Sequence, residues 1–216
     1  KKGVKLVYRK NKVSPTFVLH AYLKGGLAHE THSDNGIFHF TSKLLTYGHG
    51  KVKFESLKNE LEKKSAYMHG FSGKNAYGLN LHGLSEHFEG LVDHFAGSLL
   101  HPSFPNQHLK IEKELVKRQL LIQKEDPVKI CFNNLNQTVF NQHPYAMDLI
   151  GNEKSLKKIK RSSLMDTHQE RLKKSEIALV YCGSDELENV IEKLQPIIQS
   201  LAPRQPKAKK KNKLEP

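Results

Sequence analysis

The amino-acid sequence predicts one α+β domain of two layers, an antiparallel (mixed) sheet of about five or six strands with helices packed on one face. Three observations predict this fold class. Some segments repeat apolar residues with the period of two that strands show, and others with the helical period. These segments arrive in runs rather than in strict strand and helix alternation. A hydrophobic content of 37% is enough to build a sizeable core.

Two strands are expected at the amino end, because residues 4–9 and 17–24 alternate apolar and polar side chains. The residues 11–15 between them predict a hairpin loop. A helix is expected next over 35–47, with Ser33 or Asp34 as its N-cap.

The remaining elements follow from the same periodicities and from Pro, Gly and capping residues at their ends. They are a helix at 54–64, strands at 67–72 and 76–84, helices at 85–101, 105–124 and 127–140, short helices at 154–159 and 163–173, a strand at 177–182 and a helix at 187–201. Residues 1–203 therefore form a single domain. Beyond Pro203 the composition changes to Lys and Pro, so 204–216 is expected to be a linker or tail.

The formal net charge of +13 raises the question of nucleic-acid binding. Its distribution argues against it, because six Lys or Arg crowd into the last 13 residues and the rest are spread over the domain. We therefore expect no nucleic-acid partner. A basic module that binds an anionic polymer remains an alternative.

Cysteine content and hydropathy limit the class further. Cys131 and Cys182 are too few for a disulfide framework, and both are expected to be buried thiols. No apolar run approaches the roughly 20 residues of a membrane-spanning helix. The segment starts without Met and shows no targeting signal, so it is expected to be a piece of a longer protein.

The helix expected over 35–47 carries the most specific pattern. It reads Gly36-Ile37-Phe38-His39-Phe40-Thr41-Ser42-Lys43, which resembles the G-x-x-H-x-x-E-H motif of pitrilysin/insulinase-type zinc metallopeptidases. In that motif two His residues on one helix face grip Zn²⁺, and the Glu before the second His is the general base. Only His39 matches. Ser42 stands at the position of the Glu and Lys43 at that of the second His.

The third zinc ligand of this family is a Glu on a later helix, and alignment on Asp126-Pro127 places Gln119 there. The resemblance therefore implies a degenerate site at His39, Ser42, Lys43 and Gln119 that is not catalytic and holds no metal. The ammonium of Lys43 would repel a divalent cation.

Two predictions are open for the Lys43 side chain. It either pairs with Glu112 or Glu114, filling the space of the lost ion, or is simply exposed.

The resemblance extends over about residues 3–201. Further matching segments are Gly25-Gly26, Gly70–Asn75, Leu84-Ser85, Leu100–Pro105, Asp126-Pro127, His143–Tyr145, Gly151 and Gly183. Their order and spacing together make the resemblance specific.

The resemblance implies a noncatalytic domain that helps enclose and bind peptide substrate, while another domain of a parent zinc metalloendopeptidase supplies the zinc. The chain is most similar to the third of four domains in a bacterial enzyme of the cytoplasm or periplasm. Its expected partners are other pitrilysin-like domains, on the same or a partner chain, and a dimer stays open. The alternative is a noncatalytic subunit of a processing-peptidase-like hetero-oligomer. His143 and Tyr145 are candidate substrate contacts, or else form a rigid turn.

Overall fold

A computed structural model describes residues 4–201 of the chain. The strands are β1 (Lys5–Lys10), β2 (Thr16–Lys24), β3 (Gly48–His49), β4 (Val52–Lys53), β5 (Tyr67–Ser72), β6 (Ala76–Leu84) and β7 (Ile177–Gly183). The α-helices are α1 (Ile37–Leu44), α2 (Phe54–Lys63), α3 (Phe88–Leu100), α4 (Asn106–Glu125), α5 (Pro127–Phe140), α6 (Glu153–Lys158), α7 (Arg161–Lys174) and α8 (Leu187–Leu201). Single 3₁₀ turns are η1 (Leu27–His29), η2 (Ser85–His87) and η3 (Pro144–Ala146).

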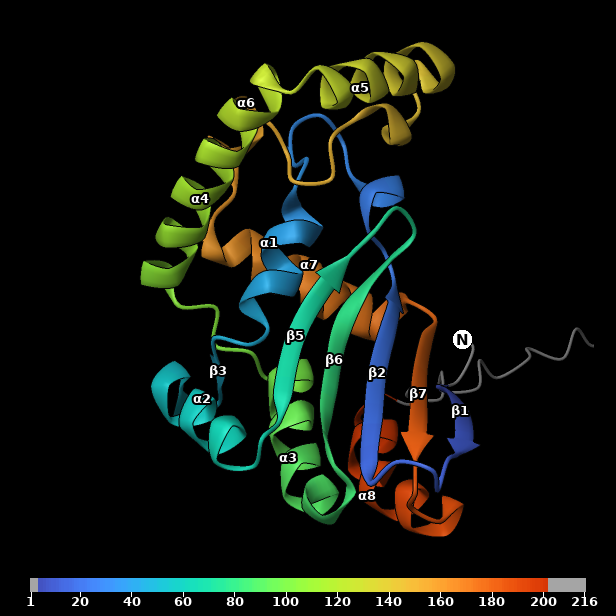
Figure 1. The fold of residues 1–216 in the computed structure, drawn as a ribbon. Coiled ribbons are helices and arrows are strands. Elements are labelled where there is room, and N and C mark those ends of the chain that lie inside the picture. The colour runs from blue at the N-terminus through green and yellow to red at the C-terminus, as the bar shows by residue number, and fades with distance from the viewer. Residues whose placement is uncertain (1–3, 202–216) are drawn as a thin grey trace, which may run out of the picture.

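Five strands form the main sheet in the order β1-β7-β2-β6-β5 (Figure 1). The pairs between β7, β2, β6 and β5 are antiparallel, and β1 runs parallel to β7. The expected mixed sheet is confirmed, but the expected hairpin between the first two strands is wrong. The reason is β7, which enters the sheet between β1 and β2 and buries every second side chain there. This strand order depends on pairing between residues 150 or more positions apart in the sequence. Local periodicity carries no information about such pairs.

Helices cover one face of this sheet, as expected (Figure 1). The inward side chains of β2 are fully buried, and these are Phe17, Leu19, Ala21 and Leu23. Their neighbours His20 and Tyr22 point to the other face and stay partly exposed. The core therefore lies between the sheet and its helices.

A buried histidine connects three elements of this core. His168 on α7 donates from Nε2 to the carbonyl of Leu99 on α3, at 2.7 Å. Its Nδ1 accepts a hydrogen bond from the Tyr77 hydroxyl on β6, at 3.0 Å. Burial lowers the pKa of His168 to about 4, so the imidazole is neutral at pH 7.

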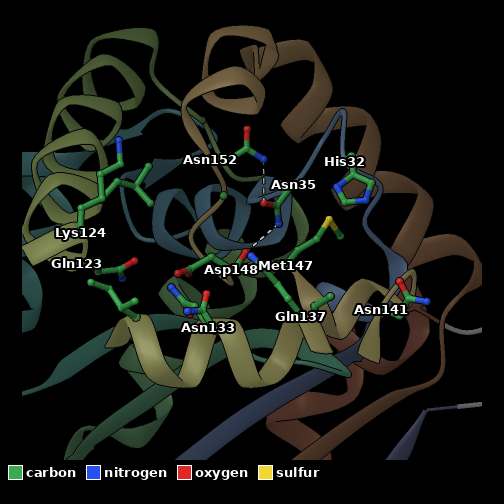
Figure 2. Close-up of a pocket in the computed structure, with 15 residues that line it drawn as sticks. His32, Asn35, Gln123, Lys124, Asn133, Gln137, Asn141, Met147, Asp148 and Asn152 are labelled. Atoms are coloured by element: carbon green, nitrogen blue, oxygen red, sulfur yellow. Dashed lines mark hydrogen bonds between the residues drawn. The ribbon is translucent and has the colours of Figure 1, made fainter. Parts of the chain in front are cut away.

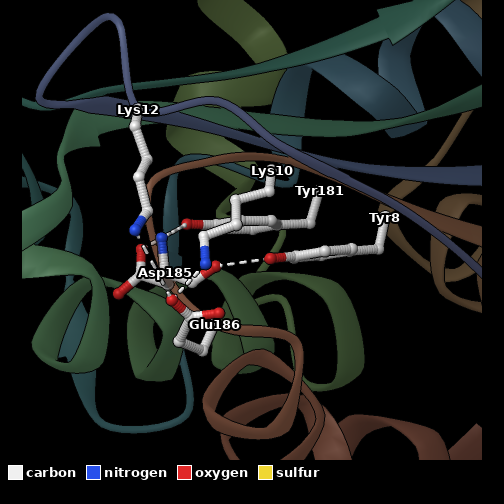
Figure 3. A network of polar contacts seen from close by, with 6 residues as sticks. All are labelled: Tyr8, Lys10, Lys12, Tyr181, Asp185 and Glu186. Atoms are coloured by element: carbon white, nitrogen blue, oxygen red, sulfur yellow. Dashed lines mark hydrogen bonds and ion pairs between the residues drawn. The ribbon is translucent and has the colours of Figure 1, made fainter.

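The start of α8 is fixed to the sheet by a polar network at the end of β7 (Figure 3). The Tyr181 hydroxyl donates to the Asp185 carboxylate, and the Tyr8 hydroxyl donates to the Asp185 carbonyl at 2.7 Å. Burial, and then the neighbouring carboxylate, raise the pKa of Tyr181. Lys10 pairs with Glu186 at the surface, where an ion pair contributes little stability.

The helix α4 and the helix α5 lie at the outer edge of the molecule, with α5 running across one end (Figure 1). The side-chain carboxylate of Asp126 caps α5 by accepting from the N–H groups of Val128 and Lys129. No residue of α5 is buried, and Cys131 on it is exposed, so the expectation of a buried thiol is wrong there. Cys182 on β7 is half-buried.

Two further expectations concern membrane spans and the basic tail. Among residues 4–201, no helix combines the length and the apolar character that crossing a membrane requires. The linker or tail expected at 204–216 lies outside the described residues.

Candidate functional site

Three of the four motif positions lie on α1. The His39 side chain is largely buried, and burial, with a smaller contribution from the Lys43 ammonium, lowers its pKa to about 4. The Ser42 hydroxyl is also buried and donates to the carbonyl of His39 at 2.9 Å. Lys43 is exposed and has no ion-pair partner within 4.0 Å among the described residues.

The fourth position is on α4, where Gln119 is exposed. The neighbouring acid that does face α1 is Glu112, which is buried and accepts a hydrogen bond from the Tyr47 hydroxyl at 2.6 Å. Burial and this carboxylate raise the pKa of Tyr47. Since Glu114 pairs with Lys117, neither acid pairs with Lys43, and the simple exposure of Lys43 is the correct reading.

These side chains do not fit a zinc ion. Zinc takes three or four His, Cys, Asp or Glu ligands in a tetrahedral arrangement. No group of three such side chains lies close enough to hold a metal within residues 4–201. The motif positions offer one imidazole, one hydroxyl already engaged as a donor, one ammonium and one exposed amide. The ammonium is the wrong charge for a cation site.

A buried carboxylate holds the start of α1. Glu30 accepts hydrogen bonds from the backbone N–H groups of Gly36 at 2.7 Å and Phe38 at 3.0 Å, and from the Asn35 amide at 2.9 Å. This replaces the N-cap expected at Ser33 or Asp34, because Asp34 instead accepts from Thr31.

The same network reaches the segment 141–152 (Figure 2). Asn35 donates to the Asp148 carbonyl at 2.8 Å, and Asn152 donates to Asn35 at 3.2 Å. Gly36, with φ of 90°, lies so close to Ile150 that a side chain there would meet its carbonyl. The network therefore fixes α1 and the segment 141–152 relative to each other.

Replacing Glu30 with Ala is expected to lower the free energy of unfolding by about 2 kcal/mol, because two buried backbone N–H groups lose their acceptor. Urea denaturation followed by circular dichroism measures this. Glu55, exposed in the first turn of α2, gives the control, and its replacement with Ala is expected to change little. Equal stability of the two variants would contradict a holding role for Glu30.

A cleft of about 540 Å³ opens beside this network, between α4, α5 and the segment 141–152. Amide side chains dominate its lining, with Leu120, Ile130 and Met147 as apolar members. Figure 2 shows Asn133 and Gln137 of α5 pointing across the cleft toward Asp148 and Met147. Within residues 4–201, the side-chain amides of Gln123, Asn133 and Gln137 form no hydrogen bond to other protein groups.

The two candidate substrate contacts lie on the same segment but do not line the cleft. His143 Nδ1 accepts from the Tyr145 N–H at 3.2 Å, and the Tyr145 hydroxyl donates to Asn75. Their rings pack together with a centroid distance of 4.5 Å, and the Lys74 ammonium lies 5.1 Å from the Tyr145 ring centre. The residues thus form an ordered turn against the β5–β6 loop, and their contact with substrate stays a prediction.

The cleft was not predicted from the sequence. The available signal was the run Asn133, Asn134, Asn136 and Gln137 within an otherwise apolar helix. At helical spacing these four amides share one side of the helix, opposite the side that carries its apolar residues.

Comparison with known proteins identifies sequences that are similar to this chain. The sequence profile described as Insulinase (Peptidase family M16) matches residues 5–153. The uncharacterized zinc protease YmxG of Bacillus subtilis is 23% identical over 162 residues, which are 75% of this chain and 40% of that protein. A probable mitochondrial-processing peptidase subunit beta of Arabidopsis thaliana is 18% identical over 200 residues, 93% of this chain and 38% of that protein.

A solved structure agrees in fold. The crystal structure of a peptidase M16 inactive domain from Pseudomonas fluorescens superposes with a TM-score of 0.84 at 20% identity, covering 94% of this chain and 50% of that one. The expected α+β fold is thereby confirmed. The chain spans about two fifths of the length of the curated relatives it matches. Because the family profile matches well over half of the residues, the chain belongs to the insulinase family of peptidases, family M16.

Proposed function

We propose that this chain is a noncatalytic domain of a zinc metalloendopeptidase, which helps enclose and bind peptide substrate while another domain supplies the zinc site. The observation that carries the proposal is the chemistry at the motif positions. The family profile matches the chain on both sides of α1, and the motif resemblance assigns Ser42 and Lys43, both on α1, to the positions of the base and the second ligand. A domain kept in this form serves through its shape and its contacts.

The local chemistry supports the loss of catalysis at these positions. A general base must accept a proton from a water molecule. The Ser42 hydroxyl is buried and donates its proton to the His39 carbonyl, so it is a poor base. Among residues 4–201 no acid pairs with Lys43, so its ammonium would repel a cation.

For the peptide contact, we favour the cleft beside α5. Side-chain amides of Asn and Gln donate and accept in the same geometry as backbone peptide groups, so free amides can bind an extended chain without regard to its sequence. A volume of about 540 Å³ falls within the range of ligand-binding clefts. Leu120 and Met147 offer apolar contact for a side chain. His143 and Tyr145 would extend this surface along the same segment.

The proposal is tested by peptide binding without cleavage. A fluorescein-labelled, unstructured peptide is titrated with the chain, and anisotropy reports binding. Replacing Asn133 and Gln137 with Ala is expected to weaken binding about tenfold, since each lost hydrogen bond contributes about 0.5–1.5 kcal/mol. Thr138→Ala, an exposed change on the same helix, is the matched control and keeps full affinity. Unchanged affinity in the double variant, or cleavage of the peptide, would count against the proposal.

A second candidate is a noncatalytic subunit of a hetero-oligomeric peptidase complex. It is favoured by relatives named as subunits, such as mitochondrial-processing peptidase subunit beta and cytochrome b-c1 complex subunit 1. The sequence of the whole gene distinguishes the two. An intact H-x-x-E-H motif on the same polypeptide supports the single-chain enzyme, and its absence supports the assembly of separate subunits.

A further inference from the structure

Helix α5 has its apolar side facing water. Val128, Phe132, Leu135 and Val139 are each between 52 and 65% exposed. Their spacing of four, three and four residues puts them on one face of the helix. Isolated exposed apolar residues are normal, but a complete helical stripe is not.

The inner side of α5, which faces the cleft, carries mainly polar side chains. Asn133 and Gln137 face the cleft together with Ile130, so α5 directs mainly polar groups toward the body of the domain and the apolar stripe away from it (Figure 2). Folding of residues 4–201 alone would favour the reverse orientation, because burial of the stripe would remove it from water. The Asp126 cap and the α4–α5 turn hold the helix as it is.

The neighbouring helix continues the pattern. Ile111, Leu115 and Ile122 on α4 are 48 to 67% exposed and share one face, whereas Leu109 and Val116 are buried on another. Together, the seven half-exposed side chains on the two helices leave on the order of 500 Å² of apolar surface in water, which approaches one side of a standard interface.

The occupant is indicated by the length of the similar proteins. This fold covers only 50% of the Pseudomonas fluorescens chain, so that chain contains about as much sequence again. A second copy of this chain fits less well, because two molecules of net charge +13 repel each other. The stripe itself contains no charged residue, which suits an apolar partner surface.

We propose that the outer faces of α4 and α5 form the docking surface for a second domain of the insulinase family, on the same polypeptide or in a partner subunit. This rests on the proposed function, and it names the surface through which the two domains pair. The cleft on the inner side of α5 would then lie next to the interface, with α5 as the shared wall.

Cys131 provides a native probe, because it lies one turn from both Val128 and Leu135 and is exposed in this domain. The parent protein, isolated with its partner subunit if it has one, is treated with iodoacetamide, and mass spectrometry follows the peptide that contains Cys131. The expected result is labelling at least about tenfold slower than in the same protein unfolded in urea. Labelling of Cys131 at the unfolded rate in the native parent overturns the proposal.

Variants make the assignment specific. Leu135→Asp places a charge in the stripe and is expected to restore rapid labelling of Cys131, whereas Thr138→Asp, exposed beside the stripe, leaves the protection intact. Equal protection in both variants contradicts the proposal. Protection of Cys131 in the purified chain alone, at high concentration and without the parent or a partner subunit, assigns the surface to self-association and also overturns the proposal.

Different experimental outcomes refute the docking surface and the proposed function. An accessible Cys131 in a parent whose described domain neither holds zinc nor cleaves peptide refutes only the docking surface. Cleavage by the domain itself refutes the proposed function, whatever the state of Cys131.

Discussion

Lowering the pH from 7 to 5 is expected to remove about 4 kcal/mol from the free energy of unfolding, about 2 kcal/mol for each of His39 and His168. Both histidines have a pKa of about 4 in the folded chain, against 6.5 when exposed. Above pH 6.5 they are neutral in both states and stability does not depend on them. Below pH 6.5 the two histidines bind protons in the unfolded chain, whereas in the folded chain they bind protons only near pH 4. Unfolding therefore becomes more favourable as the pH falls.

Other groups add to this effect or oppose it. Burial also lowers the pKa of further histidines, namely His20, His29, His49, His69 and His94, which act in the same direction. The surface carboxylates whose pKa is lowered by lysine partners, Glu114, Glu153, Glu170 and Glu186, lose their contribution only below pH 4.5. Glu30 opposes the histidines, because burial raises its pKa and the folded chain therefore takes up its proton more readily than the unfolded chain as the pH falls. The change in stability between pH 6.5 and 5 is therefore expected to come mainly from the histidines, which outnumber Glu30.

Urea denaturation at a series of pH values measures the slope. His39→Leu is the informative variant, because the His39 imidazole has no hydrogen-bond partner among residues 4–201 and its loss should reduce the acid effect by about 2 kcal/mol. His143→Leu, on the exposed turn, is the control. A flat profile in the unmodified chain, or the same slope in His39→Leu, is incompatible with these pKa values.

Replacing Gly70 with Ala is expected to lower the free energy of unfolding by about 3 kcal/mol or more. A Cβ at Gly70 would lie 1.7 Å from the Ser42 carbonyl oxygen and 2.4 Å from its carbonyl carbon. These are backbone atoms, so no side chain can move aside. Either α1 or β5 must shift, which disturbs the packing around the motif positions.

The neighbouring glycine gives a matched control. A Cβ at Gly73 would meet only the Ala76 carbonyl oxygen, at an ordinary 3.7 Å. Gly73→Ala is therefore expected to stay within about 0.5 kcal/mol of the unmodified chain. Thermal and urea unfolding of both variants measure the difference, and similar stability would refute the close approach of β5 to α1.

Much of the fold follows from periodicity. The expected strands and helices form within a few residues of their predicted bounds, because period two and the helical period are strong over these segments. Strand order was not available from the same signal, since β7 joins β1 and β2 from the far end of the chain. The cap of α1 was missed because its carboxylate, Glu30, lies six residues before Gly36 and reaches the helix only through the intervening turn.

The candidate site was predicted only in part from the sequence. The degenerate positions at His39, Ser42 and Lys43 were predicted from a motif of fixed spacing, and the structure places all three residues on α1. The orientation of α5 was not, since an amphipathic stripe shows which residues share a face and leaves open which face meets the domain. Cys131 was expected to be buried because free thiols usually are, and it is exposed because it lies on the outer side of α5.

The central claim is that the chain has a peptidase scaffold without the peptidase site. Its most direct test is to equilibrate the purified chain with zinc, remove the free ion, measure bound zinc by mass spectrometry, and incubate the chain with an unstructured peptide. The expected result is far less than one zinc per chain and an intact peptide. Stoichiometric zinc together with cleavage that a chelator abolishes would contradict the account.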